Sequence, residues 1–199
     1  MILTMMKKPI YVVTKSIGRK WIFQSLGIKV NFYSIDVPES KFEDPVETVL
    51  MNSILKCREA RRHLDGVIIT FDTVVAVDNE ILGKPKDMEE AISMLKLLSG
   101  KSHNVFTGMA IYIDGEIKTD YGEARVWFKE LSEEEIRWHV ENEEYWKFAG
   151  GYRIQGLASL FIEKIEGDFY SVVGVPLNKL YRILMKHGIN LIEYMEMET

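Results

Sequence analysis

Short β-type apolar runs alternate with amphipathic helical segments along this chain, and this alternation limits the folds open to it. Apolar runs at residues 10–13, 30–35 and 66–71 predict strands. Between the last two runs, Asp44-Pro45 signals a helix start, because Asp caps helices and Pro suits a first turn. The apolar residues that follow share one helical face: Val46, Val49, Leu50, Ile54 and Cys57. We therefore expect an α/β fold, a mixed sheet with flanking helices.

The rest of the chain continues this pattern without a repeat or a linker, so we expect a single domain over residues 1–199. The further predicted elements are helices at 19–26, 88–98, 132–142 and 176–187, a β-type segment at 74–82 with a turn at Asp78-Asn79, a strand at 160–165, and a hairpin of 105–113 with 116–128. Asp114-Gly115 supplies the hairpin turn, because both residue types tolerate positive φ.

The composition describes a chain that can bury a core. Of the 199 residues, 47% are hydrophobic and 28% are charged, which excludes general disorder. The net charge of −5 argues against a nucleic-acid partner, because such proteins are usually basic. No run approaches the roughly 18 apolar residues of a membrane span, so no membrane partner is expected. The lysines at 7 and 8 follow the first apolar residues, which is the wrong order for a secretory signal.

Several residue types have structural interpretations. The single cysteine, Cys57, excludes an intrachain disulfide and a Cys-based zinc site; it is typical of the reducing cytoplasm, and we expect it to be buried. The histidines are scattered without metal-ligand spacing, and His103 is the one whose role stays open. We also expect a solvated acidic helix face and tryptophans that pack in or near the core. The acidic face consists of Glu133 to Glu135, Glu141, Glu143 and Glu144. The tryptophans are Trp127, Trp138 and Trp146.

Asp72 interrupts the apolar pattern between the runs 67–69 and 73–75. We expect it at the end of a buried strand, where a carboxylate is costly unless it is paired, binds metal or takes part in chemistry. A loop cap is the alternative, and this segment alone leaves both interpretations open.

The first strand–turn–helix unit carries Lys15, Ser16, Arg19 and Lys20. Such a junction brings backbone N–H groups and a positive helix end to an anion, which predicts a phosphate site. The segment is not a P-loop, because it lacks the two spaced glycines before Lys-Ser/Thr. A solvated basic helix start is the alternative.

Two further segments hold polar groups on turns. Lys84 lies between Gly83 and Pro85, either as a ligand-binding lysine or as a plain surface lysine. The glycine-dense run at 149–156 permits close approach of backbone to a ligand. Within it, Gln155 offers a paired donor and acceptor that suit a base edge, and a structural turn is the alternative.

These pieces occur together in one order. The segments are Phe71-Asp-Thr-Val-Val75, Ile81-Leu-Gly-Lys-Pro85, Leu98-Ser-Gly-Lys-Ser-His-Asn-Val-Phe-Thr-Gly108, Ala149-Gly-Gly-Tyr-Arg-Ile-Gln-Gly156 and Val172-Val-Gly-Val-Pro-Leu177. From about residue 10 to residue 188, the chain resembles the Maf family of nucleoside triphosphate pyrophosphatases. The resemblance implies an elongated, two-lobed fold with a central cleft, and a homodimer.

The family hydrolyses a nucleotide between its α- and β-phosphates and uses a divalent metal. The resemblance therefore implies a nucleoside triphosphate substrate and Mg²⁺ or Mn²⁺ as cofactor. It assigns catalytic roles to Asp72, as proton acceptor, and to Lys56 and Lys84. An early glutamate of the family corresponds to Glu39, which with Asp72 is the expected metal ligand set.

The expected substrate-binding residues are Ser16, Arg19, Thr73 and Gln155. Thr73 and Gln155 favour the arm of the family that acts on dTTP and UTP over the arm that prefers 7-methyl-GTP. A nucleotide-binding regulator of cell division and septum formation, with weak or no hydrolysis, is the alternative function.

The opening motif departs from the family. Where the family usually has Ser-x-Ser-Pro-Arg-Arg, this chain has Thr14-Lys-Ser-Ile-Gly-Arg19, so Gly18 replaces the first arginine. Gly18 fits neither arm. Lys15 and Lys20 are the nearby cations that can take over part of that arginine's role.

Overall fold

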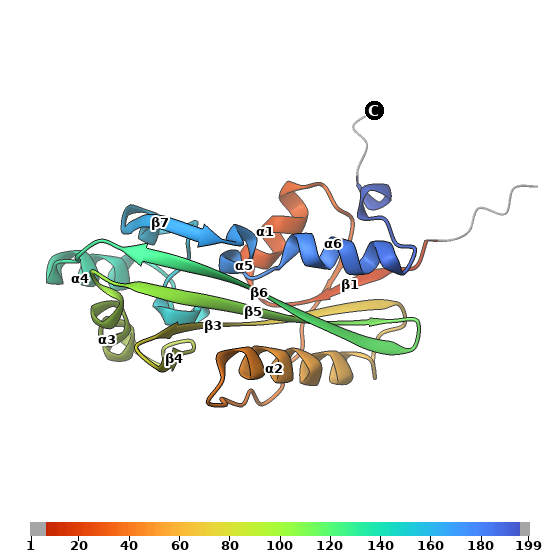
Figure 1. The fold of residues 1–199 in the computed structure, drawn as a ribbon, viewed down its shortest axis with the longest axis horizontal. Helices are drawn as coiled ribbons and strands as arrows, with labels where there is room; N and C mark the ends of the chain where they lie inside the picture. Colours follow the sequence, from red (N-terminus) through yellow and green to blue (C-terminus); the bar gives the residue numbers. More distant parts are fainter. Residues whose placement is uncertain (1–6, 196–199) are drawn as a thin grey trace, which may run out of the picture.

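A seven-stranded mixed sheet runs through the computed structural model, which describes residues 7–195 of the chain (Figure 1). The strand order is β2-β1-β3-β5-β6-β7, and β4 pairs with β3 beside this path. The strands are β1 (Ile10–Val13), β2 (Asn31–Tyr33), β3 (Val67–Val77), β4 (Glu80–Leu82), β5 (Ser102–Ile113), β6 (Glu116–Phe128) and β7 (Ile162–Gly167). The predicted α/β class is confirmed.

Helices connect and cover the strands. The α-helices are α1 (Ile17–Ser25), α2 (Pro45–Ala60), α3 (Met88–Leu98), α4 (Glu133–Asn142), α5 (Phe169–Val173) and α6 (Leu177–Lys186). Single 3₁₀ turns are η1 (Tyr145–Lys147), η2 (Ala149–Gly151), η3 (Leu157–Leu160) and η4 (Leu191–Tyr194). None of the helices within residues 7–195 is both long and apolar enough to cross a bilayer.

The sheet has a parallel part and an antiparallel part. β1 pairs in parallel with β2 and with β3, which requires the crossovers that α1 and α2 supply. β3, β5, β6 and β7 pair antiparallel. The β5–β6 turn has Asp114 at φ 50° and Gly115 at φ 86°, so the predicted hairpin is confirmed together with its turn chemistry.

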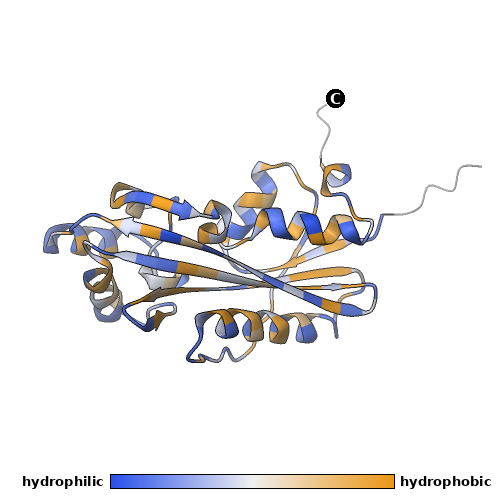
Figure 2. Cartoon of the chain, viewed as in Figure 1, coloured by the Kyte–Doolittle hydropathy of each residue, from blue (hydrophilic) through white to orange (hydrophobic). Residues whose placement is uncertain are grey.

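Alternation along β3 sends side chains to two different layers. Ile69 and Phe71 pack with α1 and α6 on one face, whereas Ile68 packs with α2 on the other. Asp72 has the same parity as Ile68 and therefore faces α2. In Figure 2 the sheet lies between α2 and α6, and orange bands mark the apolar residues of both helices.

Two apolar clusters occupy the two ends of the long strands and produce the two lobes of an elongated molecule (Figure 1). One cluster joins α3 and α4 to the sheet, with Leu95, Val140 and Phe161 among its members. The other joins α1 and α6 to it, with Phe23 and Leu184 among its members. A cleft opens between them, so the expected two-lobed shape is confirmed.

Several predicted boundaries were wrong. β3 is one continuous strand of 11 residues, so Asp72 lies in its middle and not at a strand end. The strand continues because Asp72 is satisfied by side chains of α2, so the carboxylate does not interrupt the backbone pairing with Gly108. α1 begins at Ile17, two residues before the predicted start, because Ser16 caps it. The short helix α5 was not predicted, and the strand predicted at 160–165 begins at Ile162.

The structural roles expected from composition were partly wrong. Trp138 is 40% exposed and Trp146 is 50% exposed, so these two rings do not belong to the core. Ile136, His139 and Val140 form the buried face of α4, which leaves Trp138 on the opposite side. Glu143 is buried and paired with Arg153, contrary to the expected solvated face.

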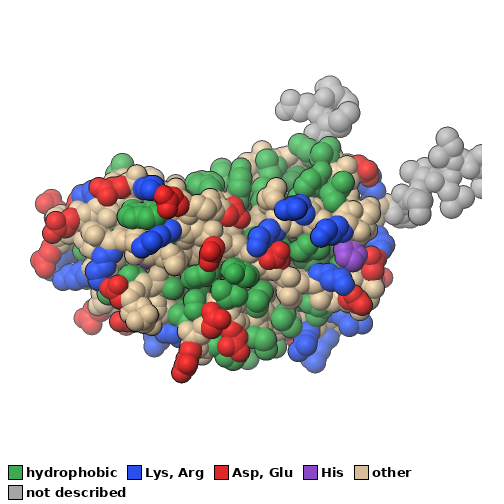
Figure 3. Space-filling model, viewed as in Figure 1, with side chains coloured by type: hydrophobic (Ala, Val, Ile, Leu, Met, Phe, Trp, Pro, Cys, Tyr) green, Lys and Arg blue, Asp and Glu red, His purple; other side chains and the backbone are tan. Residues whose placement is uncertain are grey.

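The expected burial of Cys57 is confirmed, whereas the expected absence of a nucleic-acid partner and of a secretory signal stays a prediction. Cys57 is fully buried, and burial raises the pKa of its thiol to about 11, which makes it inert. On the face shown in Figure 3, Lys and Arg intermingle with Asp and Glu without a continuous basic stripe. The first six residues, on which the expected absence of a secretory signal partly depends, lie outside the described residues.

Candidate active site

The cleft encloses about 300 Å³ between the two apolar clusters. Its walls come from the β1–α1 turn, the segment after β2, α2, the middle of β3, the turn after β4 and the loop at 147–155. All eight residues named from the sequence line it: Ser16, Arg19, Glu39, Lys56, Asp72, Thr73, Lys84 and Gln155. Lys15 also lines the cleft, whereas Lys20 does not; its ammonium lies over the ring of Phe32.

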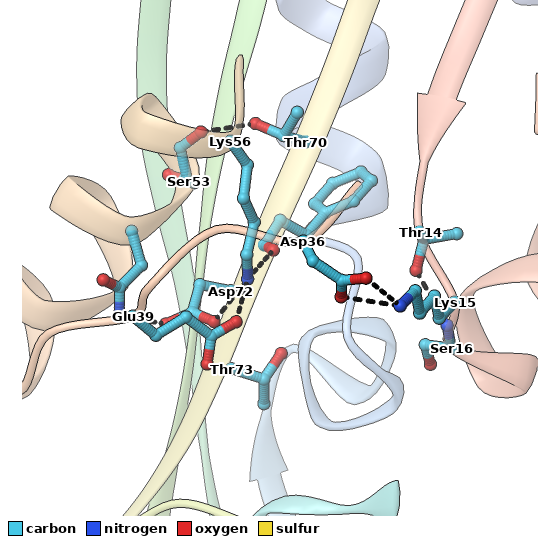
Figure 4. A network of polar contacts seen from close by, with 12 residues as sticks. Thr14, Lys15, Ser16, Asp36, Glu39, Ser53, Lys56, Thr70, Asp72 and Thr73 are labelled. Carbon is cyan, nitrogen blue, oxygen red and sulfur yellow. Dashed lines mark hydrogen bonds and ion pairs between the residues drawn. The ribbon is translucent and has the colours of Figure 1, made fainter. Parts of the chain in front are cut away.

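A buried ion network forms the floor of the cleft (Figure 4). The Lys56 Nζ lies 2.9 Å from Asp72 Oδ1 and 2.6 Å from Glu39 Oε1, and it donates to Phe71 O at 3.2 Å. Asn52 donates to Asp72 Oδ2 at 3.0 Å. Asn52 and Lys56 are one helical turn apart on α2, so both reach the same carboxylate. Asp72 is therefore a paired strand carboxylate and not a loop cap.

Exposure differs within this network. The side chains of Lys56 and Asp72 are 13% and 8% exposed, whereas Glu39 is 47% exposed. Burial by itself raises the pKa of Glu39, but the attraction of Lys56, Lys84 and Arg19 outweighs it and leaves that pKa below its ordinary value. Glu39 is thus a carboxylate anion at the open side of the network.

Arg19 reaches into the cleft from the first turn of α1. Its Nε donates to Gly174 O at 2.9 Å, and an Nη donates to Thr73 Oγ1 at 2.9 Å. Thr73 also shares a 2.8 Å hydrogen bond with Thr107. Burial lowers the pKa of Arg19, with Asp72 and Glu39 opposing that effect. The guanidinium is therefore held in one position and remains charged.

The N-terminus of α1 forms another wall of the cleft. Ser16 is its N-cap and accepts a hydrogen bond from Arg19 N at 3.4 Å. Lys15 contacts both oxygens of Asp36 at 2.6 Å, an exposed ion pair that occupies its ammonium. Lys15, Ser16 and Arg19 of this segment line the cleft and Lys20 does not, so the phosphate site at this helix end stays a prediction without Lys20.

Lys84 and Gln155 differ from the groups above because their side chains make no hydrogen bond or ion pair within the part of the chain that the structure describes. Both line the cleft and both are exposed. Burial by neighbouring groups lowers the pKa of Lys84, and the nearby Arg19 and Lys56 lower it further while Glu39 and Asp72 raise it. These two side chains are available to a ligand.

Gly18 lies buried beside Gln155. A Cβ added to Gly18 would lie 3.3 Å from Val173 Cγ1 and 3.4 Å from Gln155 Oε1. These contacts are tight, so the backbone of α1 and the amide of Gln155 approach each other where the family has an arginine.

Sequence reasoning missed three residues that build the site. Asn52 is a neutral polar residue within an apolar pattern, and only its contact with Asp72 reveals it. Thr107, which contacts Thr73, lies in the Leu98–Gly108 block, and that place was the available signal. Gly174 has φ 118°, and a Cβ there would lie 2.9 Å from Arg19 Nε. Its place in the Val172–Leu177 block was the available signal.

The carboxylates fit a divalent metal brought by a phosphate substrate. Glu39 and Asp72 each bind the same ammonium, so their oxygens lie no farther apart than the sum of those two distances. Mg²⁺ is usually bound by one or two carboxylates together with substrate phosphates and water. Within the described residues, no group of three or more His, Cys, Asp or Glu could hold a metal ion.

His103, left open by the sequence, is a core residue. Its Nε2 shares a 2.7 Å hydrogen bond with Tyr152 Oη. Burial lowers the pKa of His103 to about 4, so the ring is neutral at pH 7. It anchors the loop behind the cleft and does not line the cleft itself.

Comparison with known proteins identifies the family. Residues 9–187 match the profile of the family described as Maf-like protein. The chain is 40% identical over 182 residues to the dTTP/UTP pyrophosphatase of Caldanaerobacter subterraneus subsp. tengcongensis, covering 89% of this chain and 88% of the relative. It is 42% identical over 194 residues to the protein of the same name from Alkaliphilus oremlandii, covering 93% and 100%. The protein from Thermotoga maritima, also so named, is 40% identical over 183 residues, covering 90% and 89%. The chain therefore belongs to the Maf family.

Proposed function

We propose that this protein hydrolyses dTTP and UTP between the α- and β-phosphates and releases the nucleoside monophosphate and pyrophosphate. The observation that carries the proposal is the buried Asp72 carboxylate, held by Lys56 and Asn52 in a cleft that Arg19 and Lys84 also enter. Relatives about 40% identical over most of the chain are named dTTP/UTP pyrophosphatases, which supports the same substrate class.

The cations account for binding of the phosphate tail. Arg19, Lys56 and Lys84 come from α1, α2 and the turn after β4, and they converge on one cleft. Arg19 and Lys56 are fixed by hydrogen bonds before substrate arrives. Preorganised positive charge of this kind stabilises the charge that develops on phosphate oxygens in the transition state. Lys84, which has no protein partner in the described chain, is the group free to follow the leaving pyrophosphate.

Asp72 is the proposed general base. Oδ1 is held by Lys56 and Oδ2 by Asn52, so the carboxylate has a defined orientation from which to take the proton of an attacking water. Glu39 and Asp72 would hold the divalent cation, Mg²⁺ or Mn²⁺, whose chemistry is to neutralise phosphate charge and acidify bound water. Proton transfer to Asp72 weakens its attraction to Lys56, whose ammonium stays in place through Glu39 and Phe71 O.

We assign recognition of the base and ribose to the part of the cleft wall that Ser16, Thr73 and Gln155 line. The Gln155 amide is free and offers both a donor and an acceptor, which match the adjacent carbonyl and N–H of a uracil or thymine edge. The Thr73 hydroxyl already binds Arg19 and Thr107, so it acts mainly by fixing Arg19. Ser16 presents the N-terminus of α1 to an anionic group.

A purified-protein assay tests this function. The protein is incubated with Mg²⁺ or Mn²⁺ and a panel of dTTP, UTP, CTP, 7-methyl-GTP and the common purine triphosphates, and pyrophosphate and monophosphate are quantified. We expect monophosphate from dTTP and UTP, and its loss in Asp72→Asn. Turnover that survives in this variant would refute the base assignment. Nucleotide binding without turnover by the wild type would instead support the regulator, which the names of the relatives do not favour.

Two properties of the whole molecule are part of the proposal. We expect a homodimer, which the mass in solution tests, and a cytoplasmic location, consistent with one buried cysteine that has no disulfide partner in this chain. The substrate carries its charge in the phosphate tail, so no nucleic-acid partner is required.

A further inference from the structure

The buried carboxylate of Glu143, outside the proposed catalytic network, is hydrogen-bonded to the loop that carries Gln155. The Glu143 side chain is 4% exposed and lies where α4 ends. Its Oε1 accepts from Arg153 Nε at 3.0 Å, and its Oε2 accepts from Leu157 N at 3.0 Å. The two donors belong to residues two before and two after Gln155. One carboxylate therefore spans the turn at whose centre Gln155 lies.

The turn is built around this contact. A Cβ on Gly156 would lie 2.1 Å from Glu143 Oε2 and 2.7 Å from Arg153 Nε, so only glycine lets the carboxylate reach both donors. Gly156 N donates to Arg153 O at 3.2 Å, which closes the turn from inside. Residues 152–156 belong to no strand or α-helix, so no regular backbone pairing fixes their positions. The two hydrogen bonds to Glu143 hold this turn instead.

The energetics indicate a positional role. The ion pair is buried on the Glu143 side only, since Arg153 is 34% exposed, and desolvation of the carboxylate offsets much of its attraction to the guanidinium. Its geometry nevertheless restricts the groups that it joins. The Gln155 side chain has no hydrogen bond of its own to the described chain, so its direction depends on the backbone that carries it.

We propose that Glu143 is a positioning residue for nucleotide-base selection, acting through Arg153 and the Leu157 amide to aim Gln155 at the pyrimidine edge. This inference rests on the proposed function, which assigns Gln155 to the base. Glu143 contacts neither Asp72 nor the three cations assigned to the phosphate tail, Arg19, Lys56 and Lys84, so its removal should change base affinity and leave the chemical step intact. Its partner Arg153 lines the cleft as well, so phosphate binding is measured separately in the test.

Glu143→Gln tests the proposal, because it retains the volume of the side chain but has one acceptor oxygen where two are needed. We expect KM for dTTP to rise about tenfold with kcat within about twofold, since removal of an interaction that is equally strong in the ground and transition states changes KM alone. The inhibition constant of inorganic tripolyphosphate, which has no base, should stay within about twofold. Glu141→Gln is the matched control, an exposed charge on the same helix.

A double-mutant cycle with Gln155→Ala separates positioning from general damage. Gln155→Ala alone should lower kcat/KM for dTTP, and adding Glu143→Gln should lower it by less than about a further twofold. Effects that multiply, or a parallel loss of tripolyphosphate binding, would overturn the proposal. If the single variant does not fold, Glu143→Gln with Arg153→Met removes both charges and must give the same KM shift.

The same cycle is measured on the dissociation constant of a non-hydrolysable α,β-methylene dUTP. If wild-type protein turned over no nucleotide, the proposed function would fail while these dissociation constants still decided the role of Glu143. If wild-type protein bound no nucleotide, both proposals would be overturned.

Discussion

The two walls of the cleft are built in different ways. The catalytic wall consists of β3 and α2, where Asp72, Lys56 and Asn52 are held by regular structure and by each other. The recognition wall consists of turns, where Lys84 and Gln155 have no partners within the described chain. From this contrast we predict that the proposed catalytic groups keep their positions when a nucleotide binds, whereas Lys84 and Gln155 gain their hydrogen bonds from it.

The largest expected effect tests the catalytic wall. Asp72→Asn removes the proposed base and should lower kcat by about 10²–10⁴ while nucleotide still binds. The fold should persist, because Lys56 keeps its ion pair with Glu39. Steady-state kinetics with a thermal melt checks both points, and an unchanged kcat would contradict the assignment.

Lys56→Met tests how much the shared cation of the catalytic wall contributes to the stability of the fold. The methionine keeps the apolar stem but leaves the Asp72 and Glu39 carboxylates without their shared cation. We expect the free energy of unfolding at pH 7 to fall by about 3 kcal/mol, and kcat to fall as well. Chemical denaturation at several pH values checks the cause: the part of the loss that comes from the pair with Glu39 should shrink as the pH falls through the lowered pKa of Glu39, where that carboxylate takes up its proton in both proteins. A pH-independent loss would point to packing instead.

Lys84→Met probes the recognition wall. Because the ammonium has no ion pair in the part of the chain described, its removal should cost little stability. Loss of one phosphate interaction should raise KM or lower kcat/KM by about tenfold, the usual range for one charge-assisted hydrogen bond. A melting temperature lowered as much as in Lys56→Met would show that Lys84 also stabilises the fold, which contradicts the proposed difference between the two walls.

Glu39→Gln should give the smallest effect on stability. The pKa of Glu39 is held below its ordinary value of 4.5, so the ionised group stabilises the fold above that value and loses its contribution as the pH falls through the lowered pKa. With the side chain 47% exposed, the difference from wild type at pH 7 should be below about 1 kcal/mol. Denaturation midpoints of the wild type and Glu39→Gln, measured from pH 7 to pH 3, check whether the difference in stability between them disappears at the acidic end.

Local features of the fold were predictable because their causes lie within a few residues. Asp44 caps α2, Ser132 caps α4 and Asp114-Gly115 makes the hairpin turn, each through contacts with immediate neighbours. The eight candidate site residues came mostly from the resemblance to the Maf family, and they do line one cleft. Burial of Trp138 and exposure of Glu143 were mispredicted, because composition does not say which face of α4 meets the sheet.

The sequence by itself determined the α/β class, the helix caps and the hairpin, since each depends on periodicity or on hydrogen bonds between near neighbours. Only the tertiary structure decided the partners of the buried charges. Asp72 lies mid-strand because α2 delivers Lys56 and Asn52 to it, Arg19 binds the carbonyl of Gly174 across 155 residues, and Glu143 closes on Arg153. These pairings depend on the order of strands in the sheet and on the faces that the helices cover, and no spacing along the chain specifies them.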